Sequence, residues 1–135
     1  MKNFRPFQTI AVVVAAGLII ETANANFTFS GVAAGDATTN DVIVWTRAKD
    51  ESNPQPTNIN VQITTDPTFN SGVSTPLAGT GAALTDYTVK TNIGSLQSGT
   101  VYYYRFQTMD GLITSNIGKS RQLPVLWIAL RCVSE

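Results

Sequence analysis

Short segments of alternating apolar and polar residues run through this chain from Asn26 to about Leu123, with clusters of turn-forming residues between them. A β-strand needs this period of two, whereas an amphipathic helix needs a period of 3.6 sustained over ten or more residues. The sequence shows no such helical stripe in this region, so it predicts an all-β domain. Strands of this length and spacing are typical of a two-sheet sandwich of about seven strands, with a barrel as the alternative.

The individual strands can be placed by their β-branched and aromatic residues. They are expected around Phe27 and Phe29, and at Asp41–Ala48, Asn58–Asp66, Asp86–Leu96, Thr100–Thr108 and Gly111–Leu123. The segment Asn70–Ala83 is rich in Gly, Ser and Thr and predicts at most a weak edge strand. The pair Asp110-Gly111 predicts a two-residue hairpin turn.

The segment "LQSGTVYYYRFQT" (96–108) places Tyr102, Tyr104 and Phe106 on one face of a strand. Its Leu-x-x-Gly-Thr-x-Tyr spacing resembles the tyrosine corner of fibronectin type III and other immunoglobulin-like domains, in which a Tyr hydroxyl bonds back to the preceding loop. Tyr102 is the residue expected to do this, with Trp45 as a large core residue beneath it. A stacking platform for sugars or bases is the alternative interpretation of the tyrosines, but core packing is the usual role of such alternation.

The first 25 residues predict a secretory signal peptide. Lys2 and Arg5 precede an apolar run from Ile10 to Ile20, and Ala23-Asn24-Ala25 offers an A-x-A cleavage site. A membrane anchor is the alternative, but the run is about half as long as the ~20 residues that a spanning helix needs. We therefore expect a bacterial protein exported to the periplasm or beyond, beginning near Asn26 and free of the membrane after cleavage.

The remaining 110 residues carry 7 basic and 8 acidic side chains, without a basic cluster. Nucleic-acid binding needs a concentrated positive face, so that class of partner is not expected. Cys132 is the one cysteine, so no disulfide can form within the chain. We expect a monomer with one domain at residues 26–123, followed by a linker or aberrant tail at 124–135.

The sequence has no histidine, which excludes Ser-His-acid and Cys-His catalytic arrangements. The carboxylates show no D-x-D-x-D calcium-loop spacing, and "GVAAGD" lacks the Lys-Ser/Thr of a phosphate-binding loop. A glycosidase-type carboxylate pair stays open from spacing alone, but turn duty is the default for Asp36, Asp41, Asp66 and Asp110. No catalytic, cofactor-binding or metal-binding residue is therefore predicted. Cys132 is interpreted as an inert thiol.

The stretch "FTFSGVAAGDATTNDVIVWTRA" (27–48) resembles the start of the N-terminal domain of the PhoD-like alkaline phosphatases, also called phosphodiesterase/alkaline phosphatase D. The similarity continues through Val61–Phe69, Tyr87–Phe106 and Ile117–Pro124. Ala34 stands where the family usually has Ser, and Ala37 where it has Pro. The residues that match the opening motifs are Phe29, Gly31, Val32, Ala33, Gly35 and Asp36, followed by Val42, Trp45, Thr46 and Arg47.

The resemblance implies an immunoglobulin-like, fibronectin-type sandwich placed ahead of a larger metallophosphatase domain that holds divalent metals and hydrolyses phosphate esters. In this interpretation the matched residues, with Tyr102 and Tyr104, are structural. Gly31 and Gly35 are expected to permit unusual backbone angles where the first strand breaks into a turn. Asp36 and Thr39 are expected to accept hydrogen bonds from exposed amides of that turn.

The ending "VLWIALRCVSE" only faintly resembles the first strand of such a catalytic domain, and it favours a truncated or frameshifted gene product. The leading hypothesis is thus a non-catalytic phosphatase module that lacks its catalytic domain. A free-standing exported binding or adhesion domain, acting through loops such as Asp50–Thr57, is the alternative. An exposed apolar patch on one sheet would favour the module, and a charged surface without such a patch would favour the binding domain.

Overall fold

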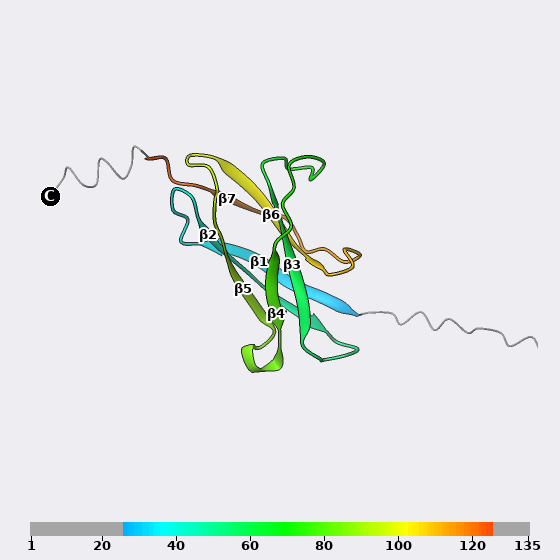
Figure 1. Cartoon of the computed structure of the whole chain (residues 1–135). Coiled ribbons are helices and arrows are strands. Elements are labelled where there is room, and N and C mark those ends of the chain that lie inside the picture. Colours follow the sequence, from blue (N-terminus) through cyan, green and yellow to red (C-terminus); the bar gives the residue numbers. More distant parts are fainter. Residues whose placement is uncertain (1–25, 126–135) are drawn as a thin grey trace, which may run out of the picture.

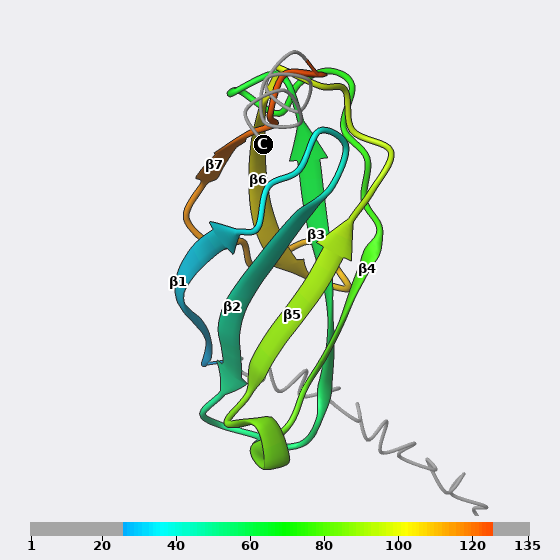
Figure 2. The ribbon, with the colours of Figure 1, turned by 90° about the vertical axis from the view of Figure 1, so that its left-hand side faces the viewer.

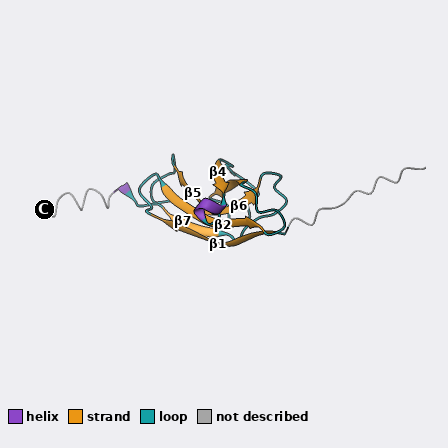
Figure 3. Cartoon of the chain, turned by 90° about the horizontal axis from the view of Figure 1, so that it is seen from below, coloured by secondary structure: helices purple, strands orange, loops and turns teal. Residues whose placement is uncertain are grey.

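The computed structural model describes residues 26–125, and strands and loops make up nearly all of this region (Figures 1 and 3). The predicted signal peptide, Cys132 and all but the first two residues of the predicted tail lie outside the described residues. Within 26–125 no helix is long and apolar enough to cross a membrane. The strands are β1 (Phe27–Gly35), β2 (Val42–Asp50), β3 (Thr57–Thr64), β4 (Leu77–Gly81), β5 (Thr88–Ile93), β6 (Val101–Thr108) and β7 (Gly118–Arg121), with one 3-10 turn, η1 (Ala83–Thr85).

The seven strands form two antiparallel sheets, as predicted. The three-stranded sheet has the order β1-β2-β5, and the four-stranded sheet has the order β4-β3-β6-β7. Figure 2 shows the three-stranded sheet in front of β3 and β6. The weak strand expected within residues 70–83 is β4, which lies at an edge of its sheet.

Alternation along each strand delivers one row of side chains to the space between the sheets. On β3 this row is Ile59, Val61 and Ile63, all buried as the sequence predicted. On β6 it is Tyr104 and Phe106, whose rings meet edge to face with their centroids 6.4 Å apart. Each fully buried apolar side chain stabilises the fold by about 1.5–3 kcal/mol, so these rows hold the two sheets together. The buried apolar side chains of the three-stranded sheet that face them are Phe27, Val42, Val44, Ala48, Val89 and Ile93.

The first strand ends within "GVAAGD" and passes into the β1–β2 loop, as predicted, because β1 stops at Gly35. Gly31 adopts the expected positive φ, +89°, and the pairing of β1 with β2 shifts register there, which makes a β-bulge. The strand then continues through Gly35, whose backbone is not in the left-handed region; Asp36 takes a positive φ instead, 49°. The prediction was therefore correct for Gly31 and wrong for Gly35.

The expected tyrosine corner is present. The Tyr102 hydroxyl accepts a hydrogen bond from the Gln97 backbone N–H at 3.0 Å, five residues upstream, and fastens the β5–β6 loop to the start of β6. Tyr104 and Phe106 lie in the core, which confirms core packing as the role of this alternation.

Two predictions about turns were wrong. The Asp110-Gly111 turn is wider than two residues, because the Gly111 N–H bonds to the Thr108 carbonyl and the Asp110 carboxylate accepts from the Leu112 N–H. In the β1–β2 loop, Thr38 performs the role predicted for Asp36 and Thr39. Its hydroxyl accepts from the backbone N–H groups of Asn40 at 3.2 Å and Asp41 at 3.0 Å.

Asp66 has the predicted turn role. Its carboxylate accepts hydrogen bonds from the N–H groups of Thr68 at 2.8 Å, Asn70 at 3.1 Å and Ser71 at 3.1 Å. The hydrogen bond from the Thr68 hydroxyl is the largest of the causes that lower the pKa of Asp66 from 3.8 to about 2. The ionised carboxylate is thus the form that closes this loop.

We expect Tyr102→Phe to lower the free energy of unfolding by about 1 kcal/mol, because the Gln97 amide loses its acceptor. Tyr103→Phe is the matched control, since the Tyr103 hydroxyl makes no hydrogen bond with residues 26–125. Urea unfolding of both variants checks this. Equal stability of the two variants would contradict a stabilising tyrosine corner.

We expect Asp66→Asn to lower the unfolding temperature at pH 7. The folded-state pKa is depressed, so the stabilisation is present above the ordinary pKa of 3.8 and disappears as the pH falls toward about 2. The gap between wild type and variant should therefore close over that interval in thermal scans. Asp36→Asn controls for loss of one surface charge, and a gap independent of pH would contradict the assignment.

Candidate functional site

Trp45 does not lie in the core as predicted. It is 37% exposed, on the outward side of β2. Its neighbours Val44 and Thr46 point inward and are buried, so strict alternation leaves Trp45 on the opposite side, with Ile43 and Arg47. The sequence held the signal for this, because Trp45 and the charged Arg47 are two residues apart.

The indole of Trp45 is supported by the backbone of β1. A Cβ atom built on Gly35 would lie 3.2 Å from both Cη2 and Cζ3 of the indole, so this glycine leaves the space that the ring occupies. Ala33, another small residue of β1, is the register partner of Trp45. On the other side of β2, the partner of Trp45 is Lys90 of β5. Gly35 is thus explained by a steric contact that the sequence did not reveal.

We call the outward side of the three-stranded sheet around this ring the Trp45 face, defined by Ala33, Gly35, Ile43, Trp45 and Lys90. A shallow groove runs beside it over β1 and β2. The lining residues of this groove are Ser30, Gly31, Val32, Ala33, Trp45, Thr46, Arg47 and Thr88. Six of the twelve residues predicted to be structural line this groove: Gly31, Val32, Ala33, Trp45, Thr46 and Arg47. Asp36 lies just beyond the end of β1, and Tyr102 and Tyr104 belong to the other sheet.

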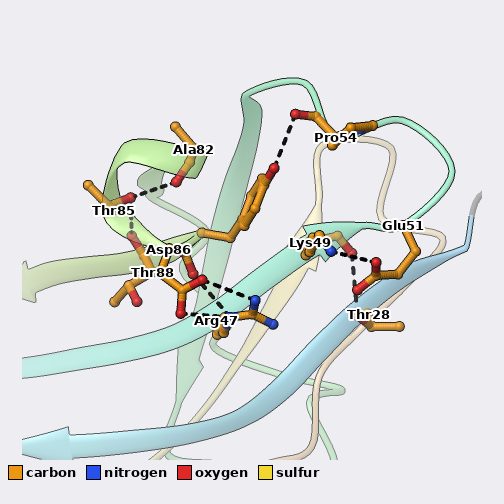
Figure 4. Close-up of polar contacts among 10 residues, drawn as sticks. Thr28, Arg47, Lys49, Glu51, Pro54, Ala82, Thr85, Asp86 and Thr88 are labelled. Carbon is orange, nitrogen blue, oxygen red and sulfur yellow. Dashed lines mark hydrogen bonds and ion pairs between the residues drawn. The ribbon is translucent and has the colours of Figure 1, made fainter.

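Arg47 is held at one end of the groove by Asp86 (Figure 4). Its Nε donates to Asp86 Oδ2 at 3.2 Å, and its Nη2 donates to Asp86 Oδ1 at 3.1 Å. The Arg47 hydrogen bond lowers the pKa of Asp86, and the Asp86 partner raises that of Arg47. Both groups are solvent-exposed, so this pair mainly positions the guanidinium and ties β2 to the turn before β5.

Asp66, Asp86 and Asp110 each have a hydrogen-bonding partner within the sandwich. No cluster of three His, Cys, Asp or Glu side chains that could hold a metal ion occurs within residues 26–125. The lowered pKa values of Asp66, Asp86 and Asp110 each have a local hydrogen-bonding partner as their main cause. The Trp45 face presents an exposed aromatic residue with Lys90 as its cross-strand neighbour.

A family model described as "PhoD-like phosphatase, N-terminal domain" matches residues 13–124. The chain belongs to this family. A solved structure of PhoD is 28% identical, with a TM-score of 0.57 over 70% of this chain. The match covers 19% of the PhoD chain, so this chain spans about a fifth of the length of that relative. No curated protein matches the sequence.

Two more distant structures share the fold alone. The short form of the sensor domain of the anti-sigma factor RsgI4 from Pseudobacteroides cellulosolvens is 11% identical, with a TM-score of 0.54 over 77% of this chain and 99% of that domain. A fibronectin type III domain of the human KIAA0970 protein is 16% identical, with a TM-score of 0.50 over 75% of each chain. The predicted PhoD-like membership and fibronectin-like sandwich are thus confirmed.

We expect Gly35→Ala to lift the indole of Trp45 away from β1, because the added methyl group would meet the ring at 3.2 Å. Overpacking of this kind costs about 1 kcal/mol, and the exposed ring can move to limit the cost. In a Trp127→Phe background Trp45 is the sole tryptophan. Acrylamide should quench the Trp45 fluorescence of Gly35→Ala/Trp127→Phe more strongly than that of Trp127→Phe alone. Ser30→Ala is the control on the same strand. Unchanged quenching in Gly35→Ala would contradict the contact.

Proposed function

We propose that this chain is a non-catalytic β-sandwich module of an exported PhoD-like alkaline phosphatase/phosphodiesterase, and that it stabilises and positions a metallophosphatase domain. The observation that carries the proposal is the family match over residues 13–124, which spans nearly the whole described sandwich. The family is a phosphatase family, and its N-terminal domain implies a partner domain within full-length relatives.

The residue chemistry supports a non-catalytic role. A two-metal phosphatase centre holds its ions with several converging ligands and clamps an in-line displacement between them. The sequence contains no histidine, and the carboxylates of Asp66, Asp86 and Asp110 are engaged in turns or an ion pair. Divalent metals in this proposal belong to the partner domain. Export rests on the signal-peptide pattern of residues 1–25.

The alternative role, adhesion through Asp50–Thr57, has less support. The Asp50 carboxylate closes this loop by accepting from the N–H groups of Ser52 at 2.9 Å and Asn53 at 3.1 Å, which is ordinary turn geometry. An exposed apolar patch on one sheet would favour the module; the outward side of the three-stranded sheet presents one exposed large apolar side chain, Trp45. We therefore propose a monomer whose partner is a protein domain.

The test is a chimera in which this chain, up to Val125, replaces the N-terminal domain of PhoD. Sandwiches of this fold exist alone, as the RsgI4 sensor domain shows, so the replacement can fold independently. We expect the full chain alone to leave p-nitrophenyl phosphate and bis-p-nitrophenyl phosphate intact with Mg²⁺, Ca²⁺, Mn²⁺ or Zn²⁺ present. The chimera should hydrolyse a phosphate ester and resist heat better than PhoD without any N-terminal domain. Hydrolysis by the chain alone, or a chimera no better than the deletion, would refute the proposal.

A further inference from the structure

We propose that the Trp45 face is the surface on which the metallophosphatase domain of PhoD-like proteins docks. An apolar hollow of that domain receives the indole, and a carboxylate at the rim of the hollow pairs with Lys90. This inference rests on the proposed function and adds to it the face, the anchor residue and the chemistry of the partner surface.

The first observation is the exposure of Trp45 itself. The residue is 37% exposed, so about a third of a large apolar side chain faces water. The absence of a side chain at Gly35 leaves the space that the indole occupies against β1, so the position of the ring depends on this glycine. Preplaced aromatic rings at the centre of a small patch are typical anchors of protein interfaces.

The second observation is that Tyr103 on the opposite sheet and Phe69 in its β3–β4 loop already have cation partners. Lys119 Nζ lies 5.9 Å from the centre of the Tyr103 ring, and Arg105 Cζ lies 4.4 Å from that of Phe69. Arg105 Nε also donates to Gln62 Oε1 at 2.7 Å. Within residues 26–125, Trp45 has no ring or cation partner and Lys90 has no ion pair. Among these three aromatic rings, Trp45 is therefore the one without a partner in the described residues.

The third observation is where the chain leaves the sandwich after β7. The Leu123 N–H donates to the Thr38 carbonyl of the β1–β2 loop at 2.9 Å, and the Gln122 N–H donates to the Thr100 carbonyl at 2.9 Å. The Gln122 side chain is fully buried, and with its amide turned to satisfy its surroundings it donates to the carbonyls of Thr38 at 3.0 Å and Asp41 at 2.9 Å. These bonds fix the exit of the chain at the β1–β2 loop (Figure 2).

This exit is close to the Trp45 face. Thr38 follows Gly35, on which the indole rests, by three residues, and three residues span at most about 10 Å. A domain that begins soon after this exit would lie near the ring at a high effective concentration. The following domain is thus the occupant that the geometry favours over a second copy of the chain.

The experiment is hydroxyl-radical footprinting with mass spectrometry, on the full chain alone and on the PhoD chimera described above. Tyr103, an outward aromatic on the other sheet, is the internal control. We expect oxidation of Trp45 to fall about fivefold or more in the chimera, as for a buried interface anchor, and oxidation of Tyr103 to stay unchanged. Trp45→Ala in the chimera should speed thermal inactivation about tenfold or more, and Tyr103→Ala should not.

The outcomes separate the two proposals. A chimera that is active and stabilised, but oxidised at Trp45 as readily as the chain alone, overturns the docking face and leaves the proposed function standing. A chimera without activity or stabilisation, built on a chain that folds alone, overturns both. Concentration-dependent protection of Trp45 in the chain alone, with a dimer mass by light scattering, assigns the face to a second copy and overturns the docking proposal.

Discussion

The packing of the two inner faces against each other is the constraint on which the rest of this molecule depends. Val42 and Val44 of β2 and Val61 of β3 are completely buried, and they face a core that Tyr104 and Phe106 fill from β6. Once this row of β2 is fixed inward, period-two alternation fixes every other residue of the strand outward. The position of Trp45 is therefore a consequence of the core, although Trp45 is not part of it.

The fold was predictable because burial and alternation act at the scale of single strands. The alternation of Ile59, Val61 and Ile63 predicted a strand and its buried face. The Leu-x-x-Gly-Thr-x-Tyr spacing predicted that the Tyr102 hydroxyl bonds back to the preceding loop, where it accepts from the Gln97 amide. The prediction for Trp45 was wrong because it relied on the size of the side chain and not on its position in the alternation of β2, which decides the face of the strand. Trp45 shares the outward side of β2 with the charged Arg47, and the burial of Val44 and Thr46 on the other side outweighs the general preference of large aromatic residues for the interior.

The hydrogen bonds of the β1–β2 loop and the contact between Gly35 of β1 and Trp45 of β2 were less predictable, for physical reasons. Whether Thr38 or Asp36 caps the β1–β2 loop depends on the direction of each side chain, which local composition does not determine. Gly35 looked like a residue needed for its backbone angle, but its role is to leave space for a ring on the next strand. Contacts of this kind join residues that are distant in sequence, so they emerge only when register is known.

The most direct measurement of whether this sandwich presents an aromatic anchor on its outer side is a nuclear Overhauser spectrum of the full chain. The Cη2 and Cζ3 protons of Trp45 should show contacts to the Gly35 backbone, where the indole rests, and none to the buried methyl groups of Val61 or the ring of Phe106. Contacts from the indole to Val61 and Phe106 would place Trp45 in the core and remove the basis for a docking face.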